Sequence, residues 1–333
     1  MTQASSKKII GITMGDGAGI GPEVIVKTFN RADTFKDCIP VVIGDYQVIE
    51  KAIDKFLRVP IAVHSVKSIY DISQKPYVLN ILDLENLKNS SIVFGQINSE
   101  TGKASVEYVI KAIELALAGD IDAIVTAPIS KYAIQKAGFK YDGHTEILAE
   151  KTKTANYAMA FFSEKINVTL VTTHIPLIKV AEQINKNLLF DKIYLAYNAL
   201  LNLGIKTPKI AVAGLNPHAG ESGLFGKEEE ESIVPAIKQA QHLGIKISGP
   251  FPADTLFTAN NLKYYDMFIA MYHDQGLIPV KMLAFDSAVN VTLGLPIIRT
   301  SVDHGTAFDI AGKGIANPSS MIEALKLATR FKK

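Results

Sequence analysis

Short apolar segments rich in β-branched residues recur along the chain, each bounded by Gly, Pro or Asp. Such segments are typical of strands that are buried on both faces of a sheet. The clearest are 9–13, 41–43, 123–126, 168–172, 210–213 and 267–271. Between several of them the apolar residues follow a helical period, as in 104–117 and 228–243. The alternation of strand and helix predicts an α/β fold with a mostly parallel sheet, in which ligands bind at the carboxyl ends of the strands.

The composition indicates a globular protein with a small-molecule partner. The chain has 333 residues, of which 48% are hydrophobic and 20% charged, and this usage excludes disorder, collagen and a coiled coil. Its length fits two domains or one large α/β unit. The net charge is only +2, so no basic field indicates nucleic acid as a partner.

Cysteine content and hydropathy predict a cytoplasmic protein. The single Cys38 excludes an internal disulfide and a cysteine-based metal cage, which fits a reducing compartment. No apolar run is long enough for a membrane span. The polar residues 1–8 and the short apolar run after them do not resemble a signal peptide. We therefore expect neither a membrane nor a nucleic-acid partner.

A glycine-rich loop, GDGAGIGPE at 15–23, joins the first predicted strand to a helical segment. It does not match the dinucleotide fingerprint G-x-G-x-x-G in any register. Its glycines still let a ligand approach the backbone, and Pro22 suits the first position of a helix. The loop is predicted to form part of an active-site floor, with a tight structural turn as the alternative. The acidic run KEEEE at 227–231 is predicted to be a solvated helix start.

Histidines are concentrated after predicted strands or in Gly- and Pro-rich loops: His144, His174, His218, His273 and His304. Three of them, His174, His218 and His273, each follow an apolar run closely, so a parallel sheet would bring them to the same edge. Three imidazoles with an open coordination position form the ligand set of catalytic zinc. Hydrogen-bonded structural histidines are the alternative, because no local metal-binding motif links the three.

Several polar residues lie within or beside apolar stretches. Burial of Lys281, Asn290 and Arg299 would be costly without a counter-charge, which favours an anionic ligand over the alternative of a structural ion pair. Asp274, next to the last of the three histidines, is a candidate second-shell carboxylate or a loop cap. Asp254, in PADT, is a further candidate acid or a turn residue.

Both ends of the chain resemble the β-decarboxylating dehydrogenases, the superfamily of isopropylmalate and isocitrate dehydrogenases. GDGAGIGPEV at 15–24 is similar to their GDGIGPEV motif with two residues inserted, and HGTAFDIAGKGIANP at 304–318 is similar to their adenosine-binding loop. Their aspartate metal ligands are not recognisable here, and the histidines stand in their place.

The whole chain resembles one branch, the 4-hydroxythreonine-4-phosphate dehydrogenase family of vitamin B6 (pyridoxine) biosynthesis. The motifs that carry this resemblance, in order, are GITMGDGAGIGPE, GHTE, THIPL, NPHAGESG, PADTLF, YHDQG and GLPIIRTSVDHGTA. The stretches YAMAFF, GESGLFG and DHGTAFDIA are at least as close to a sister branch that acts on 4-phosphorylated D-threonate or D-erythronate.

The resemblance implies an isocitrate/isopropylmalate dehydrogenase-like fold, with two α/β/α domains and a cleft between them. We expect a cofactor-side domain at 1–128 plus 285–333, and a domain for metal and substrate binding and dimerisation at 129–284. The resemblance also implies a homodimer whose active site lies at the interface, with one metal ligand lent by the other subunit.

Carried over position by position, the resemblance also implies site residues. One divalent metal ion (Zn, Mg, Mn or Co) is expected on His174, His218 and His273. The residues expected to contact the substrate are His144, Thr145, Lys281, Asn290 and Arg299. Lys281 is the first candidate for the catalytic proton donor, and Asp254 is the second.

A nicotinamide cofactor, NAD or NADP, is expected across 304–318. The residues expected to bind it are His304, Gly305, Thr306, Ala307, Asp309 and Ile310. NAD is favoured, because a 2′-phosphate usually recruits a basic side chain and Lys313 is the only Lys or Arg in this loop.

The resemblance implies metal-dependent oxidation of 4-phosphooxy-L-threonine, a small phosphorylated hydroxy acid, to a β-keto acid that decarboxylates to 3-amino-2-oxopropyl phosphate. The first alternative is a D-threonate or D-erythronate 4-phosphate dehydrogenase that produces dihydroxyacetone phosphate. A phosphate acyltransferase on the same fold is an alternative from another class, against which the loop at 304–318 argues. The last alternative is a metal-binding or scaffold protein without activity. The retained histidines, Lys281 and Arg299 argue against this alternative.

Overall fold

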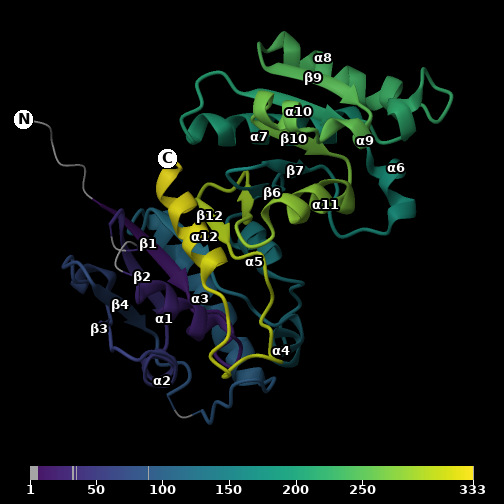
Figure 1. The fold of residues 1–333 in the computed structure, drawn as a ribbon. Coiled ribbons are helices and arrows are strands. Elements are labelled where there is room, and N and C mark those ends of the chain that lie inside the picture. The colour runs from purple at the N-terminus through teal and green to yellow at the C-terminus, as the bar shows by residue number, and fades with distance from the viewer. Residues whose placement is uncertain (1–6, 32–33, 35, 89, 333) are drawn as a thin grey trace, which may run out of the picture. The chain divides into compact units, whose positions relative to one another are not determined.

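The computed structural model describes residues 7–31, 34, 36–88 and 90–332 (Figure 1). The chain divides into two compact units. Of the described residues, the first unit holds those up to Ala155 and Leu295–Phe331, and the second holds Asn156–Gly294 and Lys332. Each unit combines a sheet with helices, so the predicted α/β class is confirmed.

The first unit has a parallel sheet of strand order β3-β4-β2-β1-β5-β12. Its strands are β1 (Lys8–Thr13), β2 (Cys38–Gly44), β3 (Ala62–Val66), β4 (Val78–Asp83), β5 (Ala123–Thr126) and β12 (Arg299–Ser301). Its helices are α1 (Gly21–Phe29), α2 (Tyr46–Phe56), the short η2 (Ile69–Asp71), α3 (Ser99–Ala118), α4 (Lys131–Lys136), α5 (His144–Lys151) and α12 (Ser319–Arg330). Helices α3 and α12 both pack on β1 and β5, and α4 and α5 pack against α3.

The second unit has a mixed sheet of order β11-β6-β7-β10-β8-β9. Pairs β11·β6 and β6·β7 are antiparallel, whereas β7, β10, β8 and β9 run parallel. The strands are β6 (Ala158–Phe162), β7 (Val168–Leu170), β8 (Lys209–Ala213), β9 (Lys246–Phe251), β10 (Met267–Ala270) and β11 (Val289–Leu293).

The helices of the second unit include two long ones, α7 (Lys186–Asn202) and α11 (His273–Ala284). The others are η3 (Leu177–Lys179), α6 (Val180–Gln183), η4 (Pro217–Gly220), the π-helical η5 (Glu229–Ile233), α8 (Val234–His242), α9 (Ala253–Leu256) and α10 (Ala259–Tyr264). Buried side chains of α11, including Leu277 and Val280, share one core with Val168, Leu170 and Phe268 of β7 and β10. This packing fixes the helix that begins with His273.

The predicted strands are confirmed as β1, β2, β5, β7, β8 and β10, and the predicted helices fall within α3 and within η5 and α8. Strand β3 has no apolar run because it is a largely exposed edge strand. Strand β12 is only three residues long and begins with Arg299, so it gives no hydrophobic signal either.

The two units differ in extent from the expected domains. Residues 129–155, expected in the second domain, belong to the first unit, because α4 and α5 pack against α3. Residues 285–294, expected in the first domain, belong to the second unit, because β11 pairs with β6. The functional roles given to the two domains stay predictions.

Among the described residues, no helix combines the length and the apolar character that a membrane span needs.

Gly102 of α3 leaves no room for a side chain where α4 packs. A Cβ built on it would lie 2.4 Å from the carbonyl carbon and oxygen of Ala133. Although alanine is the better helix former by about 1 kcal/mol, we expect Gly102→Ala to lower the free energy of unfolding by about 1–3 kcal/mol, because the backbone of α4 has to move. Urea unfolding followed by circular dichroism measures the change.

Lys103→Ala is the matched control, since Lys103 is the next residue of the same helix and is exposed. We expect it to stay within about 0.5 kcal/mol of wild type. A Gly102→Ala protein as stable as this control would contradict the steric argument.

Candidate active site

The three histidines predicted as metal ligands lie in segments that follow neighbouring strands. Strands β7, β10 and β8 lie side by side in this order and run parallel. His174 follows β7, His273 opens α11 after β10, and His218 lies in η4 after β8. Because the carboxyl ends of parallel strands share one edge of a sheet, all three segments leave from the same edge.

Gln275, which the sequence analysis did not single out, ties these segments together. Its side chain is buried in the first turn of α11. Its Oε1 accepts a hydrogen bond from the Met271 amide at 2.6 Å, and its Nε2 donates to the Gly214 carbonyl at 2.7 Å. Thr172 Oγ1 also donates to the Met271 carbonyl, at 2.7 Å. The segments leading to the three histidines are therefore joined by hydrogen bonds at their origin.

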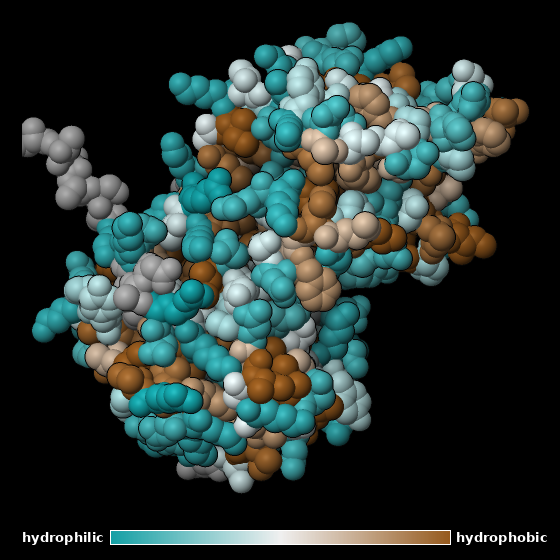
Figure 2. Space-filling model, in the orientation of Figure 1, coloured by the Kyte–Doolittle hydropathy of each residue, from teal (hydrophilic) through white to brown (hydrophobic). Residues whose placement is uncertain are grey.

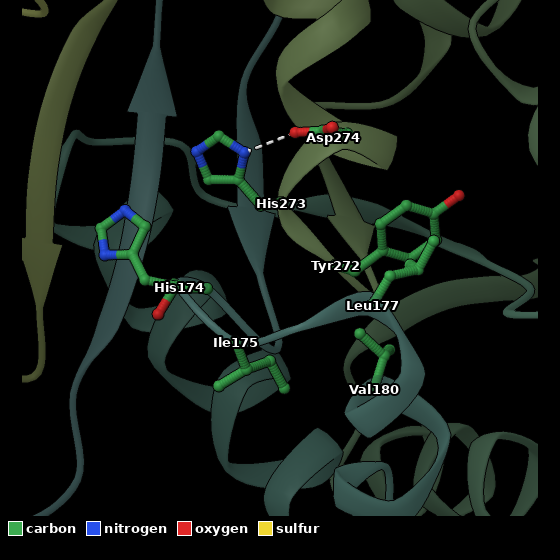
Figure 3. A pocket seen from close by; sticks show the side chains of 8 residues that line it. His174, Ile175, Leu177, Val180, Tyr272, His273 and Asp274 are labelled. Carbon is green, nitrogen blue, oxygen red and sulfur yellow. Dashed lines mark hydrogen bonds and ion pairs between the residues drawn. The ribbon is translucent and has the colours of Figure 1, made fainter.

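A cavity of about 300 Å³ lies at this edge (Figure 3). The lining residues are Thr173, His174, Ile175, Leu177, Val180, Tyr272, His273 and Asp274. The rings of His174 and His273 lie side by side, with their centroids 5.6 Å apart. His273 Nδ1 is 2.7 Å from Asp274 Oδ1. This contact orients the ring and leaves Nε2 for another partner, as the second-shell carboxylate of a metal ligand does.

His218 is not among the residues that line this cavity. Its backbone is left-handed, with φ 52°, and its side chain is 68% exposed. In the part of the chain that the structure describes, no group of three or more His, Cys, Asp or Glu side chains is arranged to hold a metal ion. The structure thus brings two of the three histidines together, and the three-histidine metal site stays a prediction.

The acidic run does begin a helix, but one of its carboxylates is not solvated. Glu229 is 3% exposed and accepts hydrogen bonds from the amides of Leu215 and Asn216 at 2.7 and 2.8 Å. The prediction of a solvated start is therefore wrong for Glu229. It holds for Glu230 and Glu231, which are exposed. A run of identical letters gives no signal by which sequence analysis could separate the buried residue from its neighbours.

The other candidates of the second unit lie on separate elements. Asp254 is exposed in α9, and α9 contacts the η4 turn that carries His218. Lys281 lies on α11, where its Nζ is 5.1 Å from the centroid of the Phe285 ring. Asn290 lies on β11. None of the three lines the cavity beside His273, so their catalytic and substrate-binding roles remain predictions.

The first unit holds a buried cation at the carboxyl end of β5. Arg299 is 4% exposed, and its Nε and Nη2 donate to Thr126 Oγ1 at 3.2 and 2.7 Å. Burial lowers the pKa of Arg299 to about 9, opposed by the charge of Glu146. The guanidinium therefore remains charged at neutral pH.

His144 is the first residue of α5 and lies near this cation. Burial, and then the charge of Arg299, hold the pKa of His144 well below its usual range, although a hydrogen bond with the Ala127 backbone opposes them. Its Nε2 atom is buried, with no hydrogen-bond partner among the described residues. His144 is thus a neutral imidazole at a helix N-terminus, it is followed by Thr145, and it lies near the buried cation Arg299. This arrangement suits an anion.

The glycine loop forms a tight turn and also supports the segment expected to bind the cofactor. Gly15 has φ +72°, and a Cβ there would lie 2.4 Å from the Pro128 carbonyl oxygen. The Ile20 amide donates to the Thr306 carbonyl at 3.0 Å. The loop therefore does form a tight turn and lies directly against 304–318, while its predicted part in an active-site floor stays a prediction.

Helix α1 anchors the far part of that segment. Glu23 is 1% exposed and accepts a hydrogen bond from the Ala316 amide at 2.8 Å. Lys27 Nζ donates to Glu23 and to the carbonyls of Gly314 and Ala316 at 2.7, 2.8 and 3.0 Å. Glu23 therefore binds a backbone amide of 314–316, and Lys27 binds two backbone carbonyls of the same segment.

The residues expected to bind the cofactor lie together in this anchored segment. Gly305 has no atom within 4 Å of the place where a Cβ would stand, and Ala307 has a left-handed backbone. His304 Nε2 is buried without a hydrogen-bond partner among the described residues. Open space beside Gly305 and a buried polar atom of His304 without a partner fit a segment that takes up a ligand.

Comparison with known proteins agrees with this arrangement. The model of the family "Pyridoxal phosphate biosynthetic protein PdxA" matches residues 36–328. A protein named "Putative D-threonate 4-phosphate dehydrogenase" from Oceanobacillus iheyensis is 49% identical over 326 residues, which are 97% of this chain and 98% of that protein. A 4-hydroxythreonine-4-phosphate dehydrogenase from Desulforapulum autotrophicum is 48% identical over 97% of this chain and 95% of its own.

The fold agrees as well. The crystal structure of a 4-hydroxythreonine-4-phosphate dehydrogenase from Klebsiella pneumoniae superposes with a TM-score of 0.90 at 40% identity, over 98% of each chain. These relatives are named dehydrogenases, which confirms the predicted enzyme class, an oxidoreductase acting on a CH–OH group, and suggests a nicotinamide cofactor. The match over nearly the whole chain confirms the resemblance seen in the sequence: the chain belongs to the family of the pyridoxal phosphate biosynthetic protein PdxA.

Proposed function

We propose that this protein is a cytoplasmic, metal-dependent dehydrogenase that oxidises 4-phosphooxy-L-threonine in pyridoxal 5′-phosphate biosynthesis. The alcohol carbon β to the carboxylate gives up a hydride to the nicotinamide, and its hydroxyl gives up a proton. The resulting β-keto acid loses carbon dioxide and takes up a proton to give 3-amino-2-oxopropyl phosphate. The single observation that carries the proposal is the buried Arg299 beside neutral His144, which suits a small anionic substrate. The relative at 48% identity bears the corresponding name.

The D-threonate 4-phosphate alternative has an equally strong relative, at 49% identity. Its substrate has the same carboxylate, secondary alcohol and phosphate, with a hydroxyl in place of the amine. The same residues would therefore bind it, and the product would be dihydroxyacetone phosphate.

His174, His218 and His273 would hold one divalent metal ion. Imidazole nitrogen suits zinc and cobalt and is less typical for magnesium, and the contact between Asp274 and His273 fits a ligating ring. When bound, the metal would supply a Lewis acid at the alcohol oxygen, and the nicotinamide would supply the hydride acceptor.

The protein's own side chains would bind the substrate and move its protons. Arg299, His144 and Thr145 would hold one anionic end of the substrate, and Asn290 would complete the contacts. Lys281 Nζ would either hold the carboxylate or deliver the proton to the carbon that loses carbon dioxide. Asp254 is the second candidate for this proton.

The cofactor would lie on 304–318, contacting His304, Gly305, Thr306, Ala307, Asp309 and Ile310. NAD is preferred to NADP, because Lys313 is the only basic side chain within the segment. In this assignment the first unit serves the cofactor, and the second serves the metal and dimerisation.

A homodimer with shared active sites would cover the exposed apolar side chains of the second unit. Ile178, in η3 just before α6, is 82% exposed. Met282 of α11 is 81% exposed, and Phe285, the residue after α11, is 69% exposed. Apolar groups lie at the surface near α6 in Figure 2. Contiguous patches of large exposed apolar side chains are typical of protein interfaces, and Met282 and Phe285 are spaced about one helical turn apart.

A substrate panel tests the proposed function. Protein loaded with divalent metal should reduce NAD when 4-phosphooxy-L-threonine is added. The reduction is measured as the absorbance of the reduced nicotinamide. The same assay is run in parallel with the 4-phosphates of D-threonate and D-erythronate, which decides between the two branches. Dihydroxyacetone phosphate is assayed as the product of these two substrates. No reduction with any of the three, with NAD or NADP, would refute the proposal.

Single histidine variants test the metal site. We expect His218→Ala and His273→Ala each to lower bound zinc, measured by mass spectrometry, well below one ion per site and to abolish turnover, because a ligand is lost. His242→Ala is the control, since His242 is exposed at the end of α8, and it should keep both. Full zinc content in both site variants would show that the assignment is wrong.

Subunit mixing tests whether the site is shared. His174→Ala and His273→Ala homodimers should each be inactive. If His273 is lent by the partner, random exchange makes half the dimers mixed, and each mixed dimer has one intact site, so activity should return to about a quarter of wild type. Persistent inactivity after exchange, demonstrated with differently tagged subunits, would mean that each site is built within one chain.

A further inference from the structure

The loop from Gly214 to Gly226, which carries His218, has an unusual backbone. His218, Ala219, Glu221 and Ser222 have φ values of 52°, 51°, 44° and 56°, and the intervening Gly220 has φ +82°. Left-handed backbone is unfavourable for residues with a Cβ and normally occurs at single positions. A run of such residues persists only where surrounding contacts determine it.

Glu229 supplies such contacts from outside the loop. Its Oε1 accepts hydrogen bonds from the Leu215 and Asn216 amides at 2.7 and 2.8 Å, and its Oε2 accepts one from Asn216 Nδ2 at 2.9 Å. The carboxylate is thus bound to the residues just before the left-handed run. Hydrogen bonds to a buried carboxylate are stronger than those between neutral groups.

The loop is also shaped to admit this carboxylate. A Cβ on Gly220 would lie 2.8 Å from Glu229 Oε2, and one on Gly214 would lie 3.2 Å from Glu229 Oε1. A side chain at either place would therefore crowd the carboxylate, more so at Gly220 than at Gly214. Glu228 Oε2 adds a second acceptor for Asn216 Nδ2, at 2.7 Å.

We propose that Glu229 is a positioning residue that holds the His218 loop in its left-handed conformation and so presents the His218 imidazole for metal binding. This inference rests on the proposed metal site. Glu229 itself does not touch the metal or the substrate. It acts by fixing the backbone just before η4.

Glu229→Gln tests the proposal with almost no change of shape. An amide keeps only one oxygen acceptor, and its NH₂ group would face an N–H donor, so at least one of the three hydrogen bonds is lost. We expect the amides of 214–226 to exchange hydrogen at least about tenfold faster in metal-free protein, measured by mass spectrometry. We expect zinc, titrated against a chelating dye, to bind about 10–100-fold more weakly, as for other residues that orient metal ligands.

Glu231→Gln is the matched control, since it removes the same charge from an exposed position of the same helix. It should match wild type in both measurements. The KM for NAD should be unchanged in both variants, because 304–318 lies in the other unit, whereas kcat should fall for Glu229→Gln alone.

His218→Ala separates the two hypotheses. Wild-type zinc affinity in His218→Ala would overturn the metal-ligand assignment and the positioning role together. Weak binding in His218→Ala with wild-type affinity in Glu229→Gln would overturn the positioning role only. Weak binding in both, with faster exchange of 214–226 in Glu229→Gln, supports the proposal.

Discussion

The parallel pairing of β7, β10 and β8 is the constraint on which the second unit depends. It places three segment origins at one sheet edge, and the buried amide of Gln275 joins the two that follow β10 and β8. A glutamine suits this place because one side chain donates to a carbonyl and accepts from an amide. His174 and His273 can lie with their rings 5.6 Å apart only because the strands before them are neighbours.

The first unit faces a different problem, a charge removed from water. Arg299 opens a short strand in the interior, where its Nε and Nη2 donate to the hydroxyl of Thr126 and the charge of Glu146 favours its charged form. Burial of a cation is costly, and an anionic ligand would offset that cost. The lowered pKa of His144 follows first from its own burial and then from the charge of Arg299, which would repel a second cation. In the proposed function, substrate binding would therefore also stabilise this unit.

Glycine has distinct uses in the two candidate sites. Gly15 lets the turn after β1 pass against the Pro128 carbonyl, and that turn in turn supports Thr306. Gly220 makes room for the carboxylate of Glu229. In both cases the glycine backbone comes close to a polar group, and a Cβ would crowd that contact. In both cases a loop with a proposed function is also held in place by residues outside the loop.

The sequence by itself determined the α/β class, the central strands and the family, because buried strands are continuous apolar runs and the motifs are local. It also placed His174, His218 and His273 after strands. Only the tertiary structure decided that β7, β10 and β8 are neighbours, that Gln275 bridges the segments after β10 and β8, and that Glu229 is buried while Glu230 and Glu231 are exposed. These facts depend on contacts between residues far apart in the chain, such as Gly214 with Gln275, and no local pattern of residues encodes such contacts.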